Sequence, residues 1–330
     1  MRKRARRERL SQLGEFGFIE RLRKLRLPRG NVEVGIGDDC AVVLAGRRRL
    51  LLTTDALIED VHFRRGWDTY AGLGRRAFAV NASDIAAMGG SPRFALLSLG
   101  APADTEVADL YGFVRGFARA AGANGCALVG GNLSESGRWM ISVTLVGEAT
   151  DPPLRRSGAR PGDLLYVSGR LGAAAFGREI LLGRRRGARG RTRAFLRPEP
   201  RLDLGRRLAR TRAASAAIDV SDGLLADLGH LCRASRVGAV VEAERLPLAQ
   251  GLSDLPEHDR LALALRGGED YELLFAVPPR RVSRLAVESR EAPPVTCIGR
   301  LTGGRRIRVL GDPAAVNASR SPGFDHFRAR

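Results

Sequence analysis

The feature that most constrains this chain is a pattern that recurs five times, in which an apolar segment delivers an acidic residue beside glycine, serine or threonine. The five places are Gly37-Asp38-Asp39, Thr53-Thr54-Asp55, Ser83-Asp84, Asp219-Val220-Ser221-Asp222 and Gly267-Gly268-Glu269-Asp270, and Asn132 after Gly130-Gly131 is close to a sixth. Any one of them alone is more typical of a turn or a helix cap. Five together indicate a shared site, because buried carboxylates are costly unless a positive charge meets them.

Asp84 is the most informative of these residues, because it falls inside a helix predicted over residues 75–88. Aspartate has a low helix propensity, so its presence there needs a reason. Carboxylates with Ser or Thr hydroxyls, and without a Cys or His cluster, suit a hard cation such as Mg²⁺. Mg²⁺ favours a few carboxylates together with substrate phosphates, and glycines allow backbone N–H groups to approach phosphate oxygens. The pattern therefore indicates a nucleotide or polyphosphate held through metal.

Strands and helices alternate in both halves of the chain, which predicts α/β or α+β architecture. In the first half we expect strands over 50–54, 93–102, 127–132 and 139–149, and helices over 75–88 and about 105–121. In the second half we expect strands over 163–169, up to 219, within 267–279, over 295–301 and over 306–311, and helices over 172–183 and from 222 onward. Ser221 is the predicted N-cap of that last helix. The segment 150–163, rich in Pro, Gly and Arg, is the predicted boundary between domains 1–149 and 150–330.

The net charge of +19 invites a nucleic-acid interpretation, but Lys3 and Lys24 are the only lysines, so the charge reflects arginine spread along the whole chain. The basic runs lack interleaved aromatic residues, so we predict no specific nucleic-acid binding. Apolar runs near the ~20 residues of a membrane span are absent, as is a signal-peptide core. The four cysteines are dispersed and form no C-x-x-C pair. We therefore expect a cytoplasmic protein with reduced thiols and no membrane partner.

The common phosphate-binding signatures are also absent from the sequence. A P-loop requires G-x-x-x-x-G-K-[ST], and neither lysine lies in such a context. The lysine strand and H-R-D loop of protein kinases are missing, and "GIGDDC" is not a dinucleotide fingerprint. The acidic pattern must therefore belong to another class of phosphate-binding protein.

The chain resembles the bacterial thiamine-monophosphate kinases from about residue 14 to 327. The segments that carry the resemblance, in the order of that family, are "GEFGFIERL", "VGIGDDCAVV", "LLTTDALIEDVHF", "AVNASDIAAMGGSPRFALLSL", "LVGGN", "RRSGARPGD", "LRPEPR", "AIDVSDGLLADLGHL", "GGEDYELLFAVP", "CIGRLT" and "GFDHF". The resemblance implies an N-terminal α/β domain whose mixed sheet pairs across a homodimer, and a C-terminal α/β domain. It also implies phosphorylation of thiamine monophosphate to thiamine diphosphate that depends on ATP and Mg²⁺.

The resemblance also implies roles for individual residues. The positions that match metal ligands are Asp39, Thr54, Asp55, Asp84, Asp219 and Asp222. The positions that match nucleotide contacts are Thr53, Gly131, Arg156 and Ser221. The positions that match contacts to the thiamine substrate are His62, Glu269 and Phe324, and the phenyl ring of Phe324 can stack on a thiamine ring.

This sequence departs from the family at two positions. Asn132 in "GGNLS" replaces a metal-binding aspartate of the family's "GGDTT". Its amide oxygen carries no charge, so we expect weaker or altered binding at one Mg²⁺. Arg76 stands where the family often has lysine before "AxAVN"; arginine keeps the charge but changes its geometry, and we attribute it to the general arginine bias.

For the chemistry we expect direct in-line transfer of the γ-phosphoryl group, by positioning and charge neutralisation. We assign no general base, because the acceptor, a phosphate monoester, is already anionic near neutral pH. Three alternatives stay open. One is another ATP-using enzyme of the aminoimidazole-ribotide-synthetase-like superfamily, acting on a different phosphate or acyl acceptor. The others are a nucleotide-binding homologue that has lost turnover and, more remotely, a nucleic-acid-binding protein.

Overall fold

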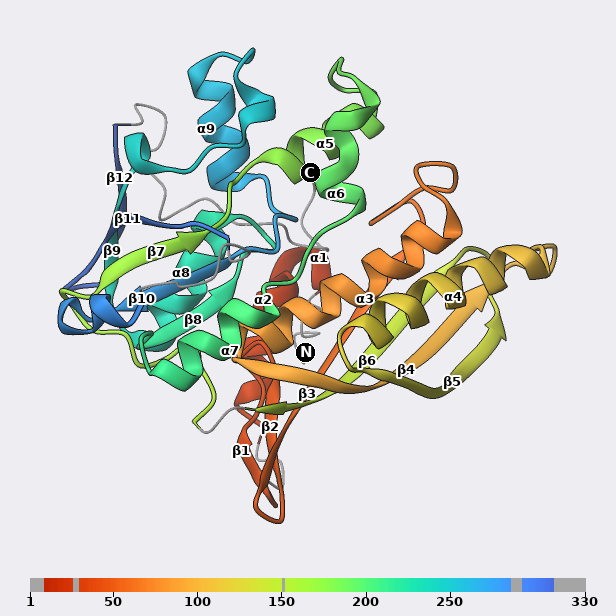
Figure 1. Cartoon of the computed structure of the whole chain (residues 1–330), viewed down its shortest axis with the longest axis horizontal. Helices are drawn as coiled ribbons and strands as arrows, with labels where there is room; N and C mark the ends of the chain where they lie inside the picture. Colours follow the sequence, from red (N-terminus) through yellow and green to blue (C-terminus); the bar gives the residue numbers. More distant parts are fainter. Residues whose placement is uncertain (1–8, 26–29, 150–151, 286–292, 312–330) are drawn as a thin grey trace, which may run out of the picture.

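The structure, a computed structural model, describes residues 9–25, 30–149, 152–285 and 293–311. Within these residues the chain forms two six-stranded sheets with helices packed against them (Figure 1). The expected α/β fold in two parts is confirmed. No helix in these described ranges is both long and apolar enough to cross a membrane.

The first sheet has the strand order β1-β2-β3-β6-β4-β5, and β4 and β5 are its parallel pair. Its strands are β1 (Val32–Val34), β2 (Ala41–Ala45), β3 (Arg48–Ile58), β4 (Gly90–Ala101), β5 (Ala127–Glu135) and β6 (Met140–Ala149). Helices α3 (Tyr70–Ala87) and α4 (Val107–Ala123) lie together over one face of this sheet (Figure 1). The opposite face of the sheet has no helix of the described chain against it.

The second sheet has the order β12-β9-β11-β7-β10-β8 and is antiparallel except for the β12–β9 pair. Its strands are β7 (Leu164–Ser168), β8 (Ala216–Asp219), β9 (Gly238–Glu242), β10 (Leu273–Val277), β11 (Val295–Thr302) and β12 (Ile307–Leu310). The α-helices of this part are α5 (Ala173–Leu181), α6 (Arg193–Leu196), α7 (Leu202–Thr211), α8 (Leu224–Ser235) and α9 (Glu257–Arg266). Short 3₁₀ turns cover Arg189–Thr192, Ala243–Arg245, Gln250–Leu252 and Pro279–Leu285.

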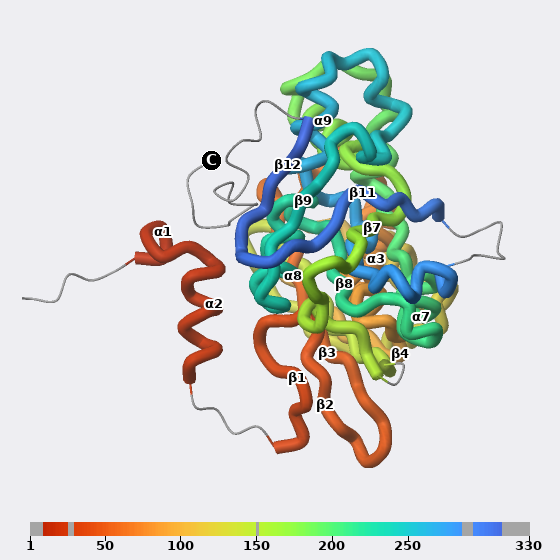
Figure 2. The backbone as a smooth tube through the Cα atoms, turned by 90° about the vertical axis from the view of Figure 1, so that its left-hand side faces the viewer, coloured from red at the N-terminus to blue at the C-terminus, as the bar shows by residue number. Residues whose placement is uncertain are grey.

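Two short helices, α1 (Leu10–Leu13) and α2 (Glu15–Arg23), precede the first sheet. Helix α2 lies beside α8, away from the two sheets (Figure 2). The ring of Phe16 on α2 is 4.6 Å from the ring of His230 on α8, measured between centroids.

Two elements are longer than the sequence predicts. Strand β3 continues past Asp55 to Ile58, because its ladder with β6 runs unbroken from the Leu50–Glu148 pair to the Ile58–Met140 pair. Helix α3 begins at Tyr70, five residues before the predicted start. Thr69 caps it, since its hydroxyl accepts a hydrogen bond from the backbone N–H of Gly72 at 3.0 Å.

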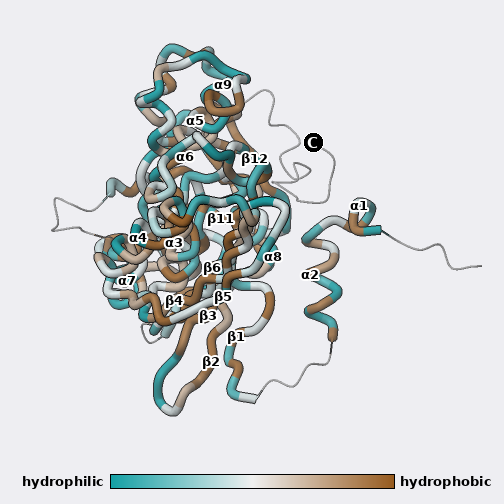
Figure 3. Tube along the Cα trace, turned by 90° about the vertical axis from the view of Figure 1, so that its right-hand side faces the viewer, coloured by the Kyte–Doolittle hydropathy of each residue, from teal (hydrophilic) through white to brown (hydrophobic). Residues whose placement is uncertain are grey.

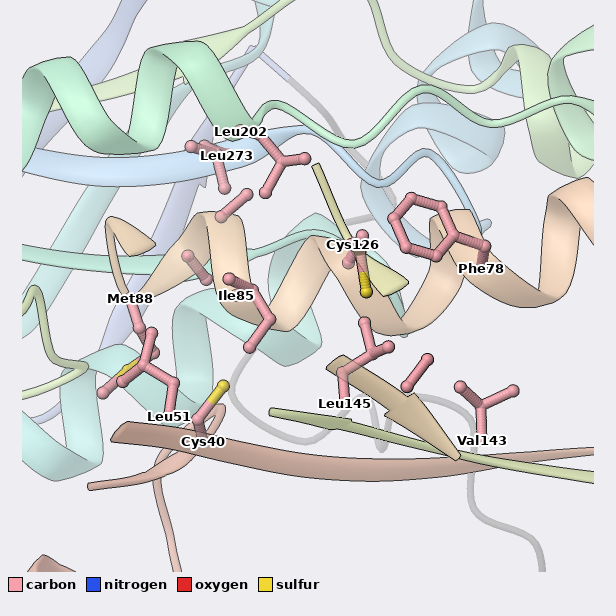
Figure 4. Packing of buried hydrophobic residues seen from close by; sticks show 14 of the residues in the cluster. Cys40, Leu51, Phe78, Ile85, Met88, Cys126, Val143, Leu145, Leu202 and Leu273 are labelled. Carbon is pink, nitrogen blue, oxygen red and sulfur yellow. The ribbon is translucent and has the colours of Figure 1, made fainter. Parts of the chain in front are cut away.

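Helix α3 packs between the two parts of the molecule. Its residues Ile85 and Met88, the latter at its C-cap, lie in one buried cluster with Leu51 of β3 and Leu273 of β10 (Figure 4). Gly74 allows α4 to approach closely, because a Cβ there would lie 2.1 Å from the carbonyl oxygen of Phe113. The acidic residue of α3 is therefore held where the two sheets meet.

Candidate active site

Three of the predicted metal ligands, from distant parts of the sequence, come together in one cluster. Asp39 precedes β2, Asp84 lies on α3, and Asp219 is the last residue of β8. One carboxylate oxygen from each lies within 4.8 Å of the other two. Three carboxylates at this spacing offer the oxygen ligands that Mg²⁺ prefers, so this donor set fits that ion.

Without a bound cation, the partly buried carboxylates of this cluster repel one another, and their ionised forms are unfavourable. Burial, together with the neighbouring carboxylates, raises the pKa of Asp84 well above its ordinary value. Burial and the charge of Asp39 raise the pKa of Asp219 to about 7. Two hydroxyls orient these acids: Thr53 Oγ1 donates to Asp84 at 2.5 Å and Ser83 Oγ donates to Asp219 at 2.7 Å. A divalent cation would remove the repulsion that the pKa values report.

Arg156 is the cation that meets this cluster from the protein side. Its Nη2 donates to Asp39 Oδ1 at 2.6 Å and its Nε to the same oxygen at 3.2 Å. The other oxygen, Asp39 Oδ2, is buried and has no hydrogen-bond partner in the described structure. Asp38 points elsewhere and accepts the backbone N–H groups of Asp39 and Arg156, both at 3.1 Å. Asp39 therefore keeps one oxygen for a cation, while Asp38 fixes the turn.

A second pair of predicted ligands, Asp55 and Asp222, lies close to the first three. Because side chains alternate along a strand, Asp55 shares the α3-facing side of β3 with Thr53. Its charge helps to raise the pKa of Asp84. Burial raises the pKa of Asp222 to about 7, and the charges of Glu15, Asp55 and Glu269 add to that shift. Glu15, at the start of α2, is a neighbour that the sequence analysis missed.

The prediction that Ser221 caps a helix starting at Asp222 is wrong. Helix α8 begins at Leu224, with Gly223 at its N-cap. The reason is Asp227, whose Oδ2 accepts the backbone N–H groups of Ser221 and Asp222, each at 3.1 Å. Asp227 is buried and was missed; an aspartate on the apolar face of "GLLADLGHL" was the available signal.

Three predicted residues are not brought to the cluster within one chain. The Oγ1 of Thr54 donates to the carbonyl of Val143 at 3.0 Å, on the face of the sheet opposite Thr53. Gly131 and Asn132 lie on β5, which is separated from β3 by β6 and β4. Three strand spacings of about 4.8 Å place Asn132 about 14 Å from β3. A side chain at Gly131 would clash with β4, since its Cβ would lie 1.7 Å from the carbonyl oxygen of Leu97.

The predicted substrate residues His62 and Glu269 meet through Arg76. Arg76 Nη1 donates to the carbonyl oxygen of His62 at 2.9 Å, and Nη2 donates to Glu269 Oε2 at 2.7 Å. The imidazole Nδ1 of His62 accepts the N–H of Ile58 at 3.0 Å, which fixes the ring. The third predicted substrate residue, Phe324, lies outside the described residues.

Comparison with known proteins identifies the class to which this fold and site belong. The family model for the N-terminal domain of AIR synthase related proteins matches residues 37–149, and the model for their C-terminal domain matches residues 160–312. The chain is a two-domain protein of this class.

Comparison with individual proteins identifies one family within this class. The chain is 40% identical to a thiamine-monophosphate kinase of Aquifex aeolicus, over 97% of this chain and 100% of the relative. It is 38% identical to the thiamine-monophosphate kinase of Escherichia coli K12, over 95% and 98% of the two chains. The solved structure of AaThiL complexed with AMPPCP and TMP matches with a TM-score of 0.84 and 37% identity, covering 98% of this chain and 100% of that one. The chain belongs to the thiamine-monophosphate kinase family.

Proposed function

We propose that this protein transfers the γ-phosphoryl group of ATP to thiamine monophosphate. A terminal phosphate oxygen of thiamine monophosphate attacks the γ-phosphorus, the bond to the β-phosphate oxygen breaks, and ADP and thiamine diphosphate result. The observation that carries the proposal is the cluster of Asp39, Asp84 and Asp219, whose carboxylates accept hydrogen bonds from Arg156, Thr53 and Ser83. The acceptor oxygen is already ionised near neutral pH, so its attack requires no general base.

We propose that the metal is Mg²⁺, held by Asp39 Oδ2, Asp84 and Asp219, with Asp55 and Asp222 available for a further ion. When bound, Mg²⁺ would neutralise charge on the triphosphate. Thr53 and Ser83 orient their carboxylates by hydrogen bonds, so the ligand oxygens are fixed before binding. Arg156 lies against Asp39, where its guanidinium can also face a phosphate group.

The acceptor end of the site is proposed to lie around Glu269 and His62. The N–H of Glu269 donates to the carbonyl of Ser221 at 2.7 Å, next to the acidic residue Asp222. This hydrogen bond ties the proposed acceptor-binding segment to the segment that follows Asp219. Phe324 stays a predicted substrate contact.

We propose that a second copy of the chain covers the open face of the first sheet. Phe94 and Leu96 of β4 and Met140 of β6 are 51%, 44% and 46% exposed there. The strands of this sheet carry long hydrophobic stretches (Figure 3). Thr54 and Asn132 lie on the same face, since Asn132 pairs with Ser98 of β4, two residues beyond Leu96. Any metal that Thr54 and Asn132 bind would then lie at the dimer interface, apart from the cluster of Asp39, Asp84 and Asp219.

We also propose a domain boundary between residues 149 and 150, because the two sheets lie on either side of it. The first sheet ends with β6 at Ala149, and the second begins with β7 at Leu164. The two family-model matches also end and begin on either side of this connection.

The test is to incubate the purified protein with ATP, Mg²⁺ and thiamine monophosphate and to separate the products by chromatography. We expect thiamine diphosphate and ADP in equal amounts. ATP binding without product, even in a single turnover, would instead indicate a nucleotide-binding homologue. Consumption of ATP only with another phosphate or acyl acceptor would point to a different enzyme of the same superfamily.

A further inference from the structure

The guanidinium of Arg76 is the most deeply buried cation of the described chain, with 2% of the residue exposed. A buried cation is unfavourable unless hydrogen bonds and an opposite charge compensate it. Its two Nη atoms donate to the carbonyl oxygen of His62 and to Glu269 Oε2, and its Cζ lies 4.1 Å from the ring centroid of Phe195. A flat, forked cation can make these three contacts at once, whereas the compact ammonium of lysine cannot.

Arg76 acts on a residue whose backbone is itself constrained. Glu269 has a φ of +64°, in the left-handed region that non-glycine residues rarely adopt. Its Oε2 also accepts the Tyr271 hydroxyl at 3.2 Å. Oε1 has no hydrogen-bond partner in the described structure, and 17% of the Glu269 side chain is exposed. One carboxylate oxygen is thus fixed by the protein and the other is left for a ligand.

The same helix carries Arg76 and the metal-site residue Asp84. Eight residues of α-helix separate them, which is about 12 Å along the axis. Because both residues lie on one continuous helix, the helix geometry sets this separation. Helix α3 therefore relates the position of Glu269 to that of the acidic cluster.

The geometry points to Arg76 as a positioning residue for the phosphoryl acceptor: it holds Glu269 so that Oε1 accepts from, or pairs with, the cationic, amine-bearing ring system of thiamine monophosphate. This inference rests on the proposed function. It predicts that changes at Arg76 affect the KM for thiamine monophosphate but not the KM for ATP. The reason is that Arg76 contacts the acceptor-binding carboxylate and lies about two helical turns from Asp84, which is proposed to hold the metal.

The test compares steady-state kinetics of Arg76→Gln, Arg76→Lys, Glu269→Gln and the double variant Arg76→Gln/Glu269→Gln. Arg75→Gln is the matched control, because it removes the same charge from the neighbouring position of α3. We expect Arg76→Gln to raise the KM for thiamine monophosphate roughly tenfold or more, the size of a hydrogen bond between charged groups. The KM for ATP should stay within about twofold, and Arg76→Lys should restore part of the loss.

The double variant distinguishes a positioning role of Arg76 from a general loss of protein stability. If Arg76 acts through Glu269, then adding Arg76→Gln to Glu269→Gln should change the KM for thiamine monophosphate by less than about twofold. Additive effects, or equal increases in both KM values, would overturn the inference.

A milder variant covers the case in which Arg76→Gln does not fold. Tyr271→Phe removes the second donor to Oε2, and it should raise the KM for thiamine monophosphate about two- to fivefold, again without changing the KM for ATP. An unchanged KM for thiamine monophosphate would overturn the inference. If the wild-type protein forms no thiamine diphosphate, the proposed function itself is refuted. If the wild type turns over normally but the variants raise both KM values equally, only the role of Arg76 is refuted.

Discussion

Arg156 donates to Asp39 at 2.6 Å, and this contact joins the segment that precedes the second sheet to the acidic turn that precedes β2. The side chain of Asp39 is fully buried and that of Arg156 is 21% exposed. A carboxylate so placed needs a positive charge in the protein itself. The ion pair satisfies that need with one oxygen of Asp39 and leaves the other for a metal.

Replacing Arg156 should therefore damage both stability and nucleotide use. We expect Arg156→Gln to lower the free energy of unfolding by about 1–3 kcal/mol, less than for a fully buried pair. We expect the KM for ATP to rise roughly tenfold, which thermal unfolding and steady-state kinetics would measure. The neighbouring Arg155→Gln is the control, because Arg155 pairs with the partly exposed Glu33 and should change stability by about 1 kcal/mol or less. Equal effects of the two substitutions would contradict this role for Arg156.

Asp84→Asn should stabilise the metal-free protein while abolishing most of its activity. Burial raises the pKa of Asp84, so the folded state loses stability as the pH rises above the pKa of the unfolded chain, and the loss is complete above the raised pKa. Asparagine removes this charge and can still accept the hydrogen bond from Thr53. In EDTA at pH 8 we therefore expect the free energy of unfolding of Asp84→Asn to exceed that of the wild type.

The same variant should lose most of the stabilisation that Mg²⁺ confers on the wild type. Thermal unfolding with and without Mg²⁺ measures both effects, and the exposed Asp104→Asn is the control. An Asp84→Asn protein that keeps the full Mg²⁺ response would rule out Asp84 as a ligand.

Thr53 and Thr54 should differ sharply, although they are neighbours of the same type. Thr53→Val removes the hydroxyl that orients Asp84, so we expect turnover to fall about tenfold or more. The Thr54 hydroxyl bonds Val143 on the other face, so Thr54→Val should leave Mg²⁺ binding by the cluster of Asp39, Asp84 and Asp219 nearly unchanged. Steady-state kinetics measures the turnover of both variants, and calorimetric titration measures their Mg²⁺ affinity. A large loss of affinity in Thr54→Val would restore the ligand role that the family resemblance implies for Thr54.

His230 should make the protein less stable in mild acid. Burial and the charge of Arg233 lower the pKa of His230 to about 3, against about 6.5 in the unfolded chain. The unfolded state therefore binds the extra proton first, so this contribution is fully present above pH 6.5 and is lost as the pH falls toward 3. By pH 5 the loss is about 2 kcal/mol at most.

Urea unfolding between pH 7.5 and pH 5 measures how steeply the free energy of unfolding depends on pH. His230→Gln should flatten this dependence, whereas replacement of His258, whose side chain is 77% exposed, should not. Identical slopes in all three proteins would exclude His230 as the cause.

The open face of the first sheet should control assembly. A charge placed there, as in Leu96→Asp, should shift the protein toward monomers, because burying an unpaired carboxylate is costly. Val107→Asp is the control, since Val107 on α4 is 66% exposed on the side away from this face. Sedimentation velocity measures both variants. A Leu96→Asp protein with the wild-type sedimentation coefficient would place the interface elsewhere.

Much of the site could be predicted from local sequence. Asp39, Asp84 and Asp219 were expected to converge because each follows or interrupts an apolar element, and the structure gathers them. The partners that hold them were not predictable in this way. Arg76 and Glu269 are 193 residues apart, and the sequence analysis assigned Arg76 to compositional bias. The start of α8 was misplaced for a related reason, since Asp227 binds backbone groups that a helix cap would otherwise take.

The sequence by itself determined the elements, the acidic residues and the family, because hydrophobic periodicity and residue type are local properties. Only the tertiary structure decided which side chains meet. Strand order separates Asn132 from β3, strand alternation turns Thr54 away from Thr53, and the packing of α3 between two sheets brings Arg76 to Glu269. These relationships depend on contacts between residues that are far apart in the sequence. Burial makes them energetically important, because a charge removed from water needs an opposite charge or hydrogen bonds inside the protein.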